Sequence, residues 1–303
     1  MQAVTSAQMA SADLAEAYRR VRARTEELCE PLEIEDYIPQ PIVDVSPPKW
    51  NIAHTTWFFE EMLLKRFAPG YQVFDPNFGF LFNSYYNSVG ERTSRDHRGD
   101  LSRPTVKRVF EYRKYVDQAM LDLLSGKDSK AYQPELTDEP TLSPSQRELF
   151  DLVVLGLNHE QQHQELFLTD LKYTFAQNPL FPVYKAGSEI HESERPNAGF
   201  INVPAGIYEI GHSGDGFCFD NELSKHRVFI NDFSISNRLV TNSEFLEFIA
   251  DNGYKDHRLW HSEGWDWINR DSVSSPLYWH FHEGAWSHYT LGGFEKLPPA
   301  DKG

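Results

Sequence analysis

Residues 158–166 read NHEQQHQEL, and this stretch is the strongest guide to the fold of the first half of the chain. It lies within a helix-forming segment that runs from about residue 143 to residue 175 and has boundary signals at both ends. His159 and His163 stand four residues apart in it, so on a helix they lie on one face and can hold one metal ion together. The stretch therefore predicts a long helix that carries two metal ligands.

Three more helices are predicted before this one, over residues 7–28, 50–66 and 104–124. Apolar residues recur with a period close to 3.6 in the first, and Pro104 stands where the third should begin. A long loop, residues 71–103, separates the second helix from the third, and loops of this length are usually functional. Four long helices with one long crossing loop predict a four-helix bundle, in which metal sites form from side chains that project inward.

His54 lies on the second of these helices and is the candidate third ligand. A histidine pair at helical spacing is more often an ordinary pair held by hydrogen bonds, so the third ligand decides the interpretation. Three neutral imidazoles leave a divalent ion with open positions, which catalysis requires. Imidazole suits iron, copper and zinc alike, so the ligand type alone does not choose the metal.

The same stretch also fits the H-E-x-x-H helix of zinc metalloproteases, with Glu160 as the general base. The extended form of that motif requires glycine and histidine at the positions that Leu166 and Thr169 occupy. A later glutamate ligand, Glu189 or Glu192, keeps this alternative open, although both lie in a predicted linker.

From about residue 199 the pattern changes to short strand-like pieces separated by Gly, Asn and Asp. Strands are predicted at residues 200–203 and 226–230, with one helix at residues 242–251. We therefore expect three parts: residues 1–181 as the bundle, residues 182–198 as a linker, and residues 199–303 as an irregular α+β domain. With few strands to close a core, this second domain is expected to be incomplete in the chain.

The composition excludes some partners. Hydrophobic residues make up 40% and charged residues 24%, as in ordinary soluble globular proteins. The formal net charge of −16 argues against nucleic acid or an anionic membrane as the main partner, because both would repel such a surface. With no apolar run of spanning length, no secretory signal pattern and only two cysteines, we expect a cytoplasmic protein.

Three arginines, Arg92, Arg95 and Arg98, lie within seven residues of the long loop. A charge run of this kind is as often a solvated surface as a binding site. In so acidic a chain, a basic cluster near a metal site also suits a substrate carboxylate that is held by paired hydrogen bonds.

Several motifs together resemble one family. Four stretches, residues 50–54 (WNIAH), 85–90 (YYNSVG), 98–104 (RGDLSRP) and 158–166, resemble the ergothioneine-biosynthesis sulfoxide synthases, the EgtB-like hercynine oxygenases. The second half is similar to the opening of a formylglycine-generating-enzyme (sulfatase-modifying) domain, on residues 203–206, 210–211, 217–222 and 240–242. This order of domains is more specific than either set of motifs alone, and the resemblance covers essentially the whole chain.

The resemblance implies a fold and a reaction. The fold is a DinB-like four-helix bundle followed by an irregular α+β domain of the C-type-lectin-like, formylglycine-generating-enzyme-like kind. In the reaction, Fe(II) and O2 couple the thiol of γ-glutamylcysteine or cysteine to C2 of the imidazole of hercynine as a sulfoxide. The metal ligands would be His54, His159 and His163.

The resemblance also implies substrate contacts. Gln162 would contact the substrate imidazole, and Arg95 and Arg98, with Arg92, would hold the carboxylates of the thiol substrate. The catalytic tyrosine of the family is expected beyond this chain, and neither Tyr278 nor Tyr289 is singled out. A separate chain could supply the remainder of the second domain.

Other classes remain open at this point. Related enzymes of the ovothiol and selenoneine pathways form C–S or C–Se bonds with the same architecture. A DinB-type metal-dependent thiol transferase would need the bundle but not the second domain. A zinc hydrolase and a non-catalytic protein that retains the metal are the remaining alternatives.

Overall fold

The computed structural model describes residues 11–84, 92–126, 144–187, 198–214 and 216–297. The chain divides into two compact units. The first holds the chain up to Thr174 together with Gly211–Lys225, and the second holds Phe175–Ile210 and the chain from His226 onward. Long helices make up the first unit, and short strands with two helices make up most of the second. This confirms the expected fold class.

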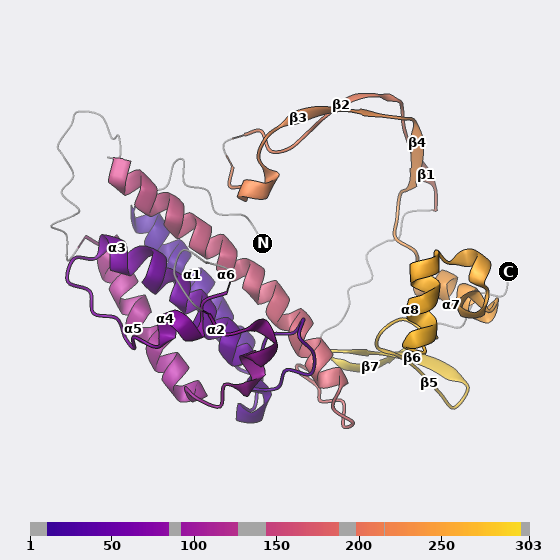
Figure 1. The fold of residues 1–303 in the computed structure, drawn as a ribbon, viewed down its shortest axis with the longest axis horizontal. Coiled ribbons are helices and arrows are strands. Elements are labelled where there is room, and N and C mark those ends of the chain that lie inside the picture. The colour runs from indigo at the N-terminus through magenta and orange to yellow at the C-terminus, as the bar shows by residue number, and fades with distance from the viewer. Residues whose placement is uncertain (1–10, 85–91, 127–143, 188–197, 215, 298–303) are drawn as a thin grey trace. The chain divides into compact units, whose positions relative to one another are not determined.

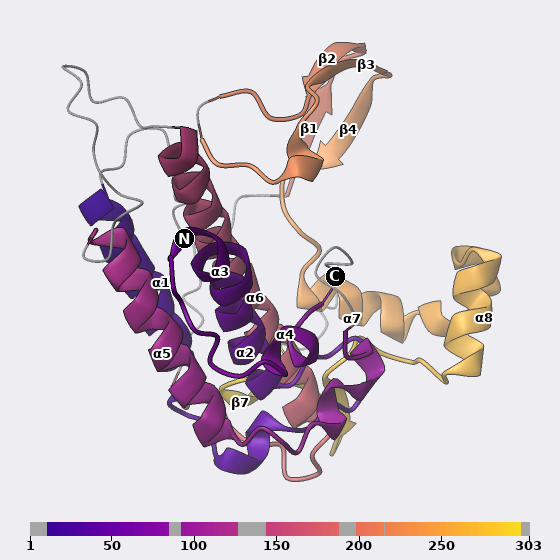
Figure 2. The ribbon, with the colours of Figure 1, turned by 60° about the vertical axis from the view of Figure 1, so that its left-hand side comes forward.

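Four long helices form the first unit and lie side by side in both ribbon views (Figures 1 and 2). They are α1 (Ser11–Cys29), α2 (Pro48–Phe59), α5 (Val106–Leu124) and α6 (Pro144–Ala176). The second helix continues through a π-helical turn, η2 (Glu60–Leu64), into α3 (Lys65–Phe67). These are the four predicted helices, although residues 7–10 of the first prediction lie outside the described part of the chain.

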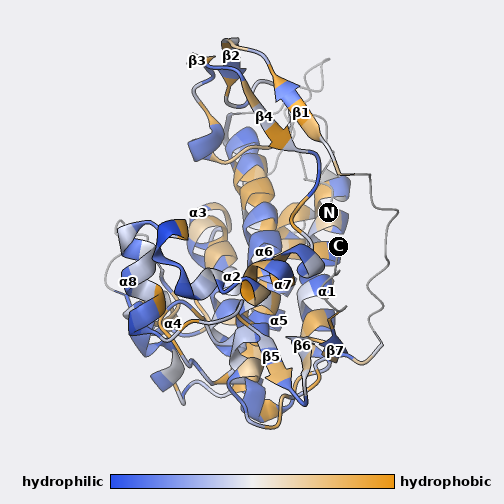
Figure 3. Cartoon of the chain, turned by 90° about the vertical axis from the view of Figure 1, so that its right-hand side faces the viewer, coloured by the Kyte–Doolittle hydropathy of each residue, from blue (hydrophilic) through white to orange (hydrophobic). Residues whose placement is uncertain are grey.

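The core of this unit forms because each long helix carries apolar residues that are buried in it. Figure 3 colours the apolar residues of these helices orange. The helix α2 is buried along its whole length. Gly156 permits the close approach of α6: a Cβ atom there would lie 2.7 Å from the Phe59 ring and 2.9 Å from the Phe58 ring. This contact lies one turn before His159 and brings α6 against α2 next to the candidate ligands.

The structure corrects two details of the predicted bundle. The helix α5 begins at Val106 rather than at Pro104, because the Thr105 side chain accepts a hydrogen bond from the Arg108 backbone nitrogen and caps the helix. The long loop is not without structure, since it contains α4 (Phe78–Leu81) and the 3-10 helix η3 (Arg95–Asp100). A further 3-10 helix, η1 (Ile34–Tyr37), follows α1. The motif at residues 85–90 lies outside the described residues.

The second unit contains three small antiparallel sheets. The strands β1 (Phe200–Val203) and β4 (Phe233–Ser236) form one pair, and β2 (Gly206–Ile210) and β3 (His226–Ile230) form another. The third sheet has the order β5 (Trp279–His282), β6 (Ala285–Thr290) and β7 (Gly293–Lys296). Of these strands, β1 and β3 were predicted with the observed bounds.

Two helices belong to the same unit. The predicted one is α7 (Asn242–Ala250), which Thr241 caps by accepting from the Glu244 backbone nitrogen. The other, α8 (Ser262–Arg270), was not predicted. Three 3-10 turns complete the described elements: η4 (Asp220–Glu222), which lies in the first unit, η5 (Gly253–Lys255) and η6 (His257–Leu259).

The first hairpin of the three-stranded sheet, between β5 and β6, has a tight turn. The loop between β5 and β6 consists of Glu283 and Gly284, with φ angles of 51° and 80°, the left-handed conformation that a two-residue turn of type I′ requires. Tyr289 on β6 is fully buried, and its hydroxyl donates to the carbonyl oxygen of Pro182. Tyr289 is therefore a packing residue of the second unit.

The predicted linker, residues 182–198, is only partly described, because residues 188–197 lie outside the described part. At its start, the backbone nitrogens of Tyr184 and Lys185 both donate to the Leu291 carbonyl oxygen. The division at residues 181 and 199 stays a prediction. Within the described residues, no helix has both the length and the apolar character that crossing a bilayer demands.

Candidate metal centre

Three imidazoles converge in the first unit. His54 comes from α2, and His159 and His163 come from successive turns of α6. Each offers a ring nitrogen, and the three nitrogens all lie within 4.8 Å of one another. In the part of the chain that the structure describes, no other group of three or more His, Cys, Asp or Glu residues meets in this way. The structure thus brings together the three ligands predicted from the sequence.

A backbone carbonyl orients the first imidazole. The Nδ1 atom of His54 lies 2.7 Å from the Phe82 carbonyl oxygen. Because a carbonyl oxygen can only accept, Nδ1 carries the proton and the lone pair is left on Nε2. Outer hydrogen bonds of this kind fix the tautomer and ring orientation of histidines that bind metals.

A side-chain amide orients His163 in the same way. The Nδ1 atom of His163 lies 2.8 Å from Oδ1 of Asn51. The amide of Asn51 is itself oriented, because its Nδ2 atom donates to the Ser46 carbonyl oxygen over 3.0 Å. The amide oxygen therefore faces His163, whose Nδ1 donates and whose Nε2 keeps its lone pair.

The third imidazole carries an unsatisfied atom. The Nδ1 atom of His159 is buried and has no hydrogen-bond partner, and a buried polar atom in that state is costly unless a ligand satisfies it. Burial lowers the pKa of His159 to about 4 and, together with the neighbouring His159, that of His163 to about 3. Burial also lowers the pKa of His54 well below its usual value. Three neutral imidazoles whose ring nitrogens lie this close together fit a divalent transition metal.

Glu160, next to His159, has a different environment. Its carboxylate accepts from Arg22 at 2.8 Å and from Arg113 at 2.7 Å, and Thr25 also donates to it. Burial alone would raise the pKa of this carboxyl, but the two guanidinium groups outweigh it and hold the pKa at about 2. A carboxylate enclosed in this way is not available to take a proton from water, which counts against the zinc hydrolase alternative. Glu189 and Glu192, its possible further ligands, lie outside the described residues.

The four predicted substrate contacts differ in exposure. Gln162 is exposed on α6 beside His163. Arg92 and Arg95 are also exposed: Arg92 donates to the Ser84 carbonyl oxygen, and Arg95 donates to the carbonyl oxygens of residues 43 and 44. Arg98, in contrast, is only 5% exposed. Contact of these side chains with a substrate stays a prediction.

The sequence did not predict the residues that orient the histidines or that fix the helix carrying two of them. Asn51 stands in the quoted stretch at residues 50–54, yet nothing local shows that its amide faces α6. Arg22 had a readable signal, because a charged residue stands there on the buried stripe of α1 between Tyr18 and Thr25. A charge on an apolar stripe predicts a buried partner of opposite charge.

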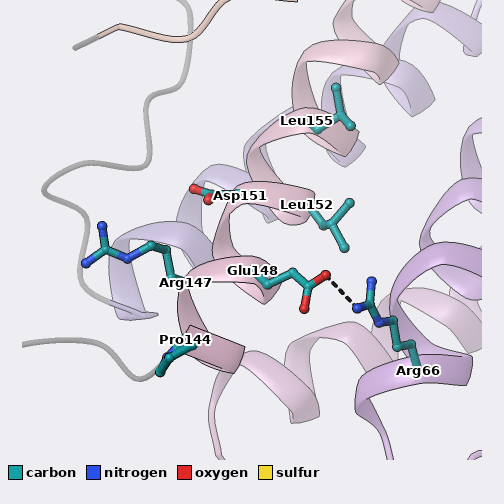
Figure 4. Close-up of a pocket in the computed structure, with 7 residues that line it drawn as sticks. All are labelled: Arg66, Pro144, Arg147, Glu148, Asp151, Leu152 and Leu155. Atoms are coloured by element: carbon teal, nitrogen blue, oxygen red, sulfur yellow. Dashed lines mark ion pairs between the residues drawn. The ribbon is translucent and has the colours of Figure 1, made fainter. Parts of the chain in front are cut away.

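A surface pocket lies on the first unit, away from the histidines. It has a volume of about 580 Å³ and lies where α3 faces the beginning of α6 (Figure 4). Its lining includes Arg66 and Glu148, which form an ion pair at 2.5 Å, and the apolar side chains of Leu152 and Leu155. Among the residues that the structure describes, its lining contains no histidine or cysteine, so this pocket is not a second candidate for a site of the same kind.

Comparison with known families matches two separate parts of the chain. Residues 17–167 match the DinB superfamily, and residues 186–288 match the sulfatase-modifying factor enzyme 1-like domain. The first match contains all three histidines, and the second covers β1 to β5 and most of β6.

Similar curated proteins include three named hercynine oxygenase. The protein of Mycobacterium tuberculosis is 28% identical over 84% of this chain and 54% of its own length. That of Mycolicibacterium thermoresistibile is 28% identical over 84% of this chain and 51% of its own length, and that of Mycolicibacterium smegmatis is 27% identical over 68% and 49%. The chain spans about half the length of these relatives. It belongs to the proteins that join a DinB superfamily domain to a sulfatase-modifying factor enzyme 1-like domain.

Proposed function

We propose that the chain carries the metal centre of an iron(II)- and O2-dependent sulfoxide synthase that acts on hercynine. The observation that supports this most directly is the convergence of His54, His159 and His163 within 4.8 Å, inside a DinB domain that a sulfatase-modifying factor-like domain follows. The name of the three relatives adds hercynine as the substrate. The family resemblance adds γ-glutamylcysteine or cysteine as the thiol.

The proposed reaction balances with O2 as the sole oxidant. The S–H bond of the thiol and the C2–H bond of the imidazole break, and a C–S bond and an S=O bond form. Oxygen accepts four electrons in total, so one oxygen atom ends in the sulfoxide and the other in water. Bound iron(II) supplies the redox chemistry for activation of O2.

The chain's own residues would bind the metal and orient the substrates. Three neutral imidazoles leave open positions for two substrates and O2, as in other three-ligand catalytic sites. Gln162 follows His159 by three residues and lies beside His163, within the helical stretch that holds the ligands, where an amide can meet the imidazole of hercynine. The exposed guanidinium groups of Arg92 and Arg95 can take the carboxylates of the thiol substrate.

Iron binding is the first test, because all three histidines lie in the first unit. We expect the purified chain, loaded anaerobically, to hold about one iron(II) per chain and to lose it in His54→Ala. His97→Ala is the matched control, since His97 is a 63% exposed histidine of the same unit outside the cluster. Equal iron content in His54→Ala and wild type would reject the centre.

Turnover is the second test. Iron-loaded chain is given hercynine and O2 with either γ-glutamylcysteine or cysteine, and products are identified by mass. A sulfoxide of hercynine that forms only with iron and O2 supports the proposal, and the preferred thiol defines the subtype. Bound iron without any such product would reject this chain, by itself, as the sulfoxide synthase.

A further inference from the structure

Arg98 differs from the two arginines that precede it in the loop. Its side chain is 5% exposed, whereas Arg92 and Arg95 are exposed. Its terminal nitrogens donate to two serine hydroxyls, at 2.8 Å to Ser46 and at 3.0 Å to Ser84. Arg98 therefore ties together two segments of chain that lie on either side of α2 in the sequence.

The first of these connections leads to His54. The Arg98 guanidinium carbon lies 3.4 Å from the centre of a Trp50 ring, and that indole stacks on the His54 imidazole at 4.5 Å with an interplanar angle of 14°. Ser84 lies two residues after Phe82, whose carbonyl oxygen receives the Nδ1 proton of His54. Arg98 thus contacts both the ring that covers His54 and the segment that orients it.

The second connection leads to His163. The Ser46 hydroxyl oxygen accepts from Arg98, and the Ser46 carbonyl oxygen accepts from the Asn51 side chain. The amide oxygen of Asn51 in turn faces Nδ1 of His163. The Ser46 backbone nitrogen also donates to Asp170 on α6 at 3.0 Å. A shift of Ser46 would therefore move the amide that orients His163.

We propose that Arg98 is a positioning residue of the metal centre, which holds the partners of His54 and His163 through Ser84, Trp50 and Ser46. The proposal rests on the three-histidine centre and reassigns Arg98 from the substrate to the surroundings of the metal. A guanidinium suits this task because its planar fork donates in two fixed directions while its face stacks on an indole. Lysine offers the charge without the fork, so it should replace Arg98 only in part.

Cobalt(II) titration of the metal-free full-length chain tests the inference, because its visible absorption reports both affinity and ligand geometry without any substrate. Loss of a direct outer partner of metal-bound histidines weakens binding about 10- to 100-fold, and Arg98 acts through such partners, so we expect Arg98→Met to bind cobalt(II) up to about 10-fold more weakly. Its absorption spectrum should also change. Arg98→Lys should fall between Arg98→Met and wild type.

The matched control is Arg95→Met, which removes an exposed arginine from the same 3-10 helix. It should keep the wild-type cobalt(II) affinity and spectrum while raising the KM for the thiol. Ser46→Ala gives a milder variant if Arg98→Met fails to fold. That change removes one hydroxyl but keeps the backbone contacts of Ser46, so it should shift affinity and spectrum in the same direction by less.

The outcomes separate the two proposals. Wild-type affinity and spectrum in Arg98→Met, with a raised KM for the thiol, would overturn the positioning role and return Arg98 to the substrate while the metal centre stands. A wild-type chain that takes up no cobalt(II) would overturn both proposals. Weaker binding and an altered spectrum in Arg98→Met, with Arg95→Met unchanged, would support the positioning role.

Discussion

Two glutamates of the helix α6 pair with arginines at nearly equal distances but in opposite surroundings. Glu148 lies 2.5 Å from Arg66 near the start of the helix, where the two side chains are 47% and 55% exposed. Glu160, twelve residues later, lies 2.7 Å from Arg113 and 2.8 Å from Arg22, and its side chain is fully buried. Distance alone would rank the first pair higher.

Burial reverses that ranking. Exposed ion pairs contribute about 0–1 kcal/mol because water and salt screen them. A buried pair that loses one partner leaves a charge without compensation, which costs about 3–5 kcal/mol. The strong contacts lie beside His159, and the weak one lies three turns away. The middle of α6 is therefore the part whose position α1 and α5 determine, and it is the part that carries the candidate ligands.

The largest expected effect comes from Glu160→Gln, which removes the carboxylate between two buried guanidinium groups. We expect a loss of about 3–5 kcal/mol in the free energy of unfolding, measured by urea denaturation of the metal-free chain. Glu165→Gln is the control, since Glu165 is an exposed glutamate of the same helix. Equal unfolding free energies for the two variants would show that the buried cluster does not hold α6.

The pH dependence of the unfolding free energy tests the role of the buried Glu160 carboxylate further. The folded-state pKa of Glu160 is about 2, below the ordinary value of about 4.3 for glutamate. A depressed pKa contributes stability that is present above the ordinary value and is lost as pH falls toward the folded value. The difference between wild type and Glu160→Gln should therefore shrink between about pH 4.3 and pH 2.

The candidate ligands and the residues that orient them were not equally predictable from sequence. The pair His159 and His163 follows from spacing within one helix, and His54 follows from the inward faces of a bundle. Asn51 and the Phe82 carbonyl act only through contacts between distant segments, which periodicity does not encode. The same reason hides Arg98, because an arginine in a polar loop looks exposed until the loop is seen against Trp50.

The strands of the second unit show another limit of prediction from sequence. The strands β1 and β3 were predicted because β-branched and aromatic residues gather there between turn residues. Their partners, β4 and β2, are as short, and apolar residues such as Ile207 and Phe233 are exposed on them. The sequence of β4, FSIS, does alternate, but apolar side chains are exposed on β1 as well, so burial does not separate the predicted strands from the missed ones.

An intermediate effect is expected from Gly156→Ala. At an exposed helical position this change would stabilise the chain by about 1 kcal/mol. Here the added methyl group meets the rings of Phe58 and Phe59 at less than 3 Å, so we expect a net loss of about 1–3 kcal/mol. The same displacement should weaken cobalt(II) binding, because Phe58 lies one turn after His54.

Gly79→Ala provides the matched control for that substitution. A Cβ atom at Gly79 would lie 3.9 Å from the Glu61 carboxylate, an ordinary contact distance. This variant should keep the wild-type cobalt(II) affinity, and its melting temperature should equal or exceed that of wild type, because alanine is favoured over glycine in a helix by up to about 1 kcal/mol. A Gly156→Ala chain that is as stable as Gly79→Ala would show that α2 and α6 can separate without cost, and that the site does not depend on their close approach.

The smallest effect is expected from Glu148→Ala, which removes the exposed ion pair with Arg66 (Figure 4). Loss of the pair with Arg66 should change the unfolding free energy by about 0–1 kcal/mol, and roughly 1 M NaCl should remove most of the difference. Cobalt(II) affinity should not change, because three helical turns separate Glu148 from His159. A loss as large as that of Glu160→Gln, or weaker metal binding, would mean that the first turns of α6 also position the histidines. The buried cluster would then be one of two anchors rather than the principal one.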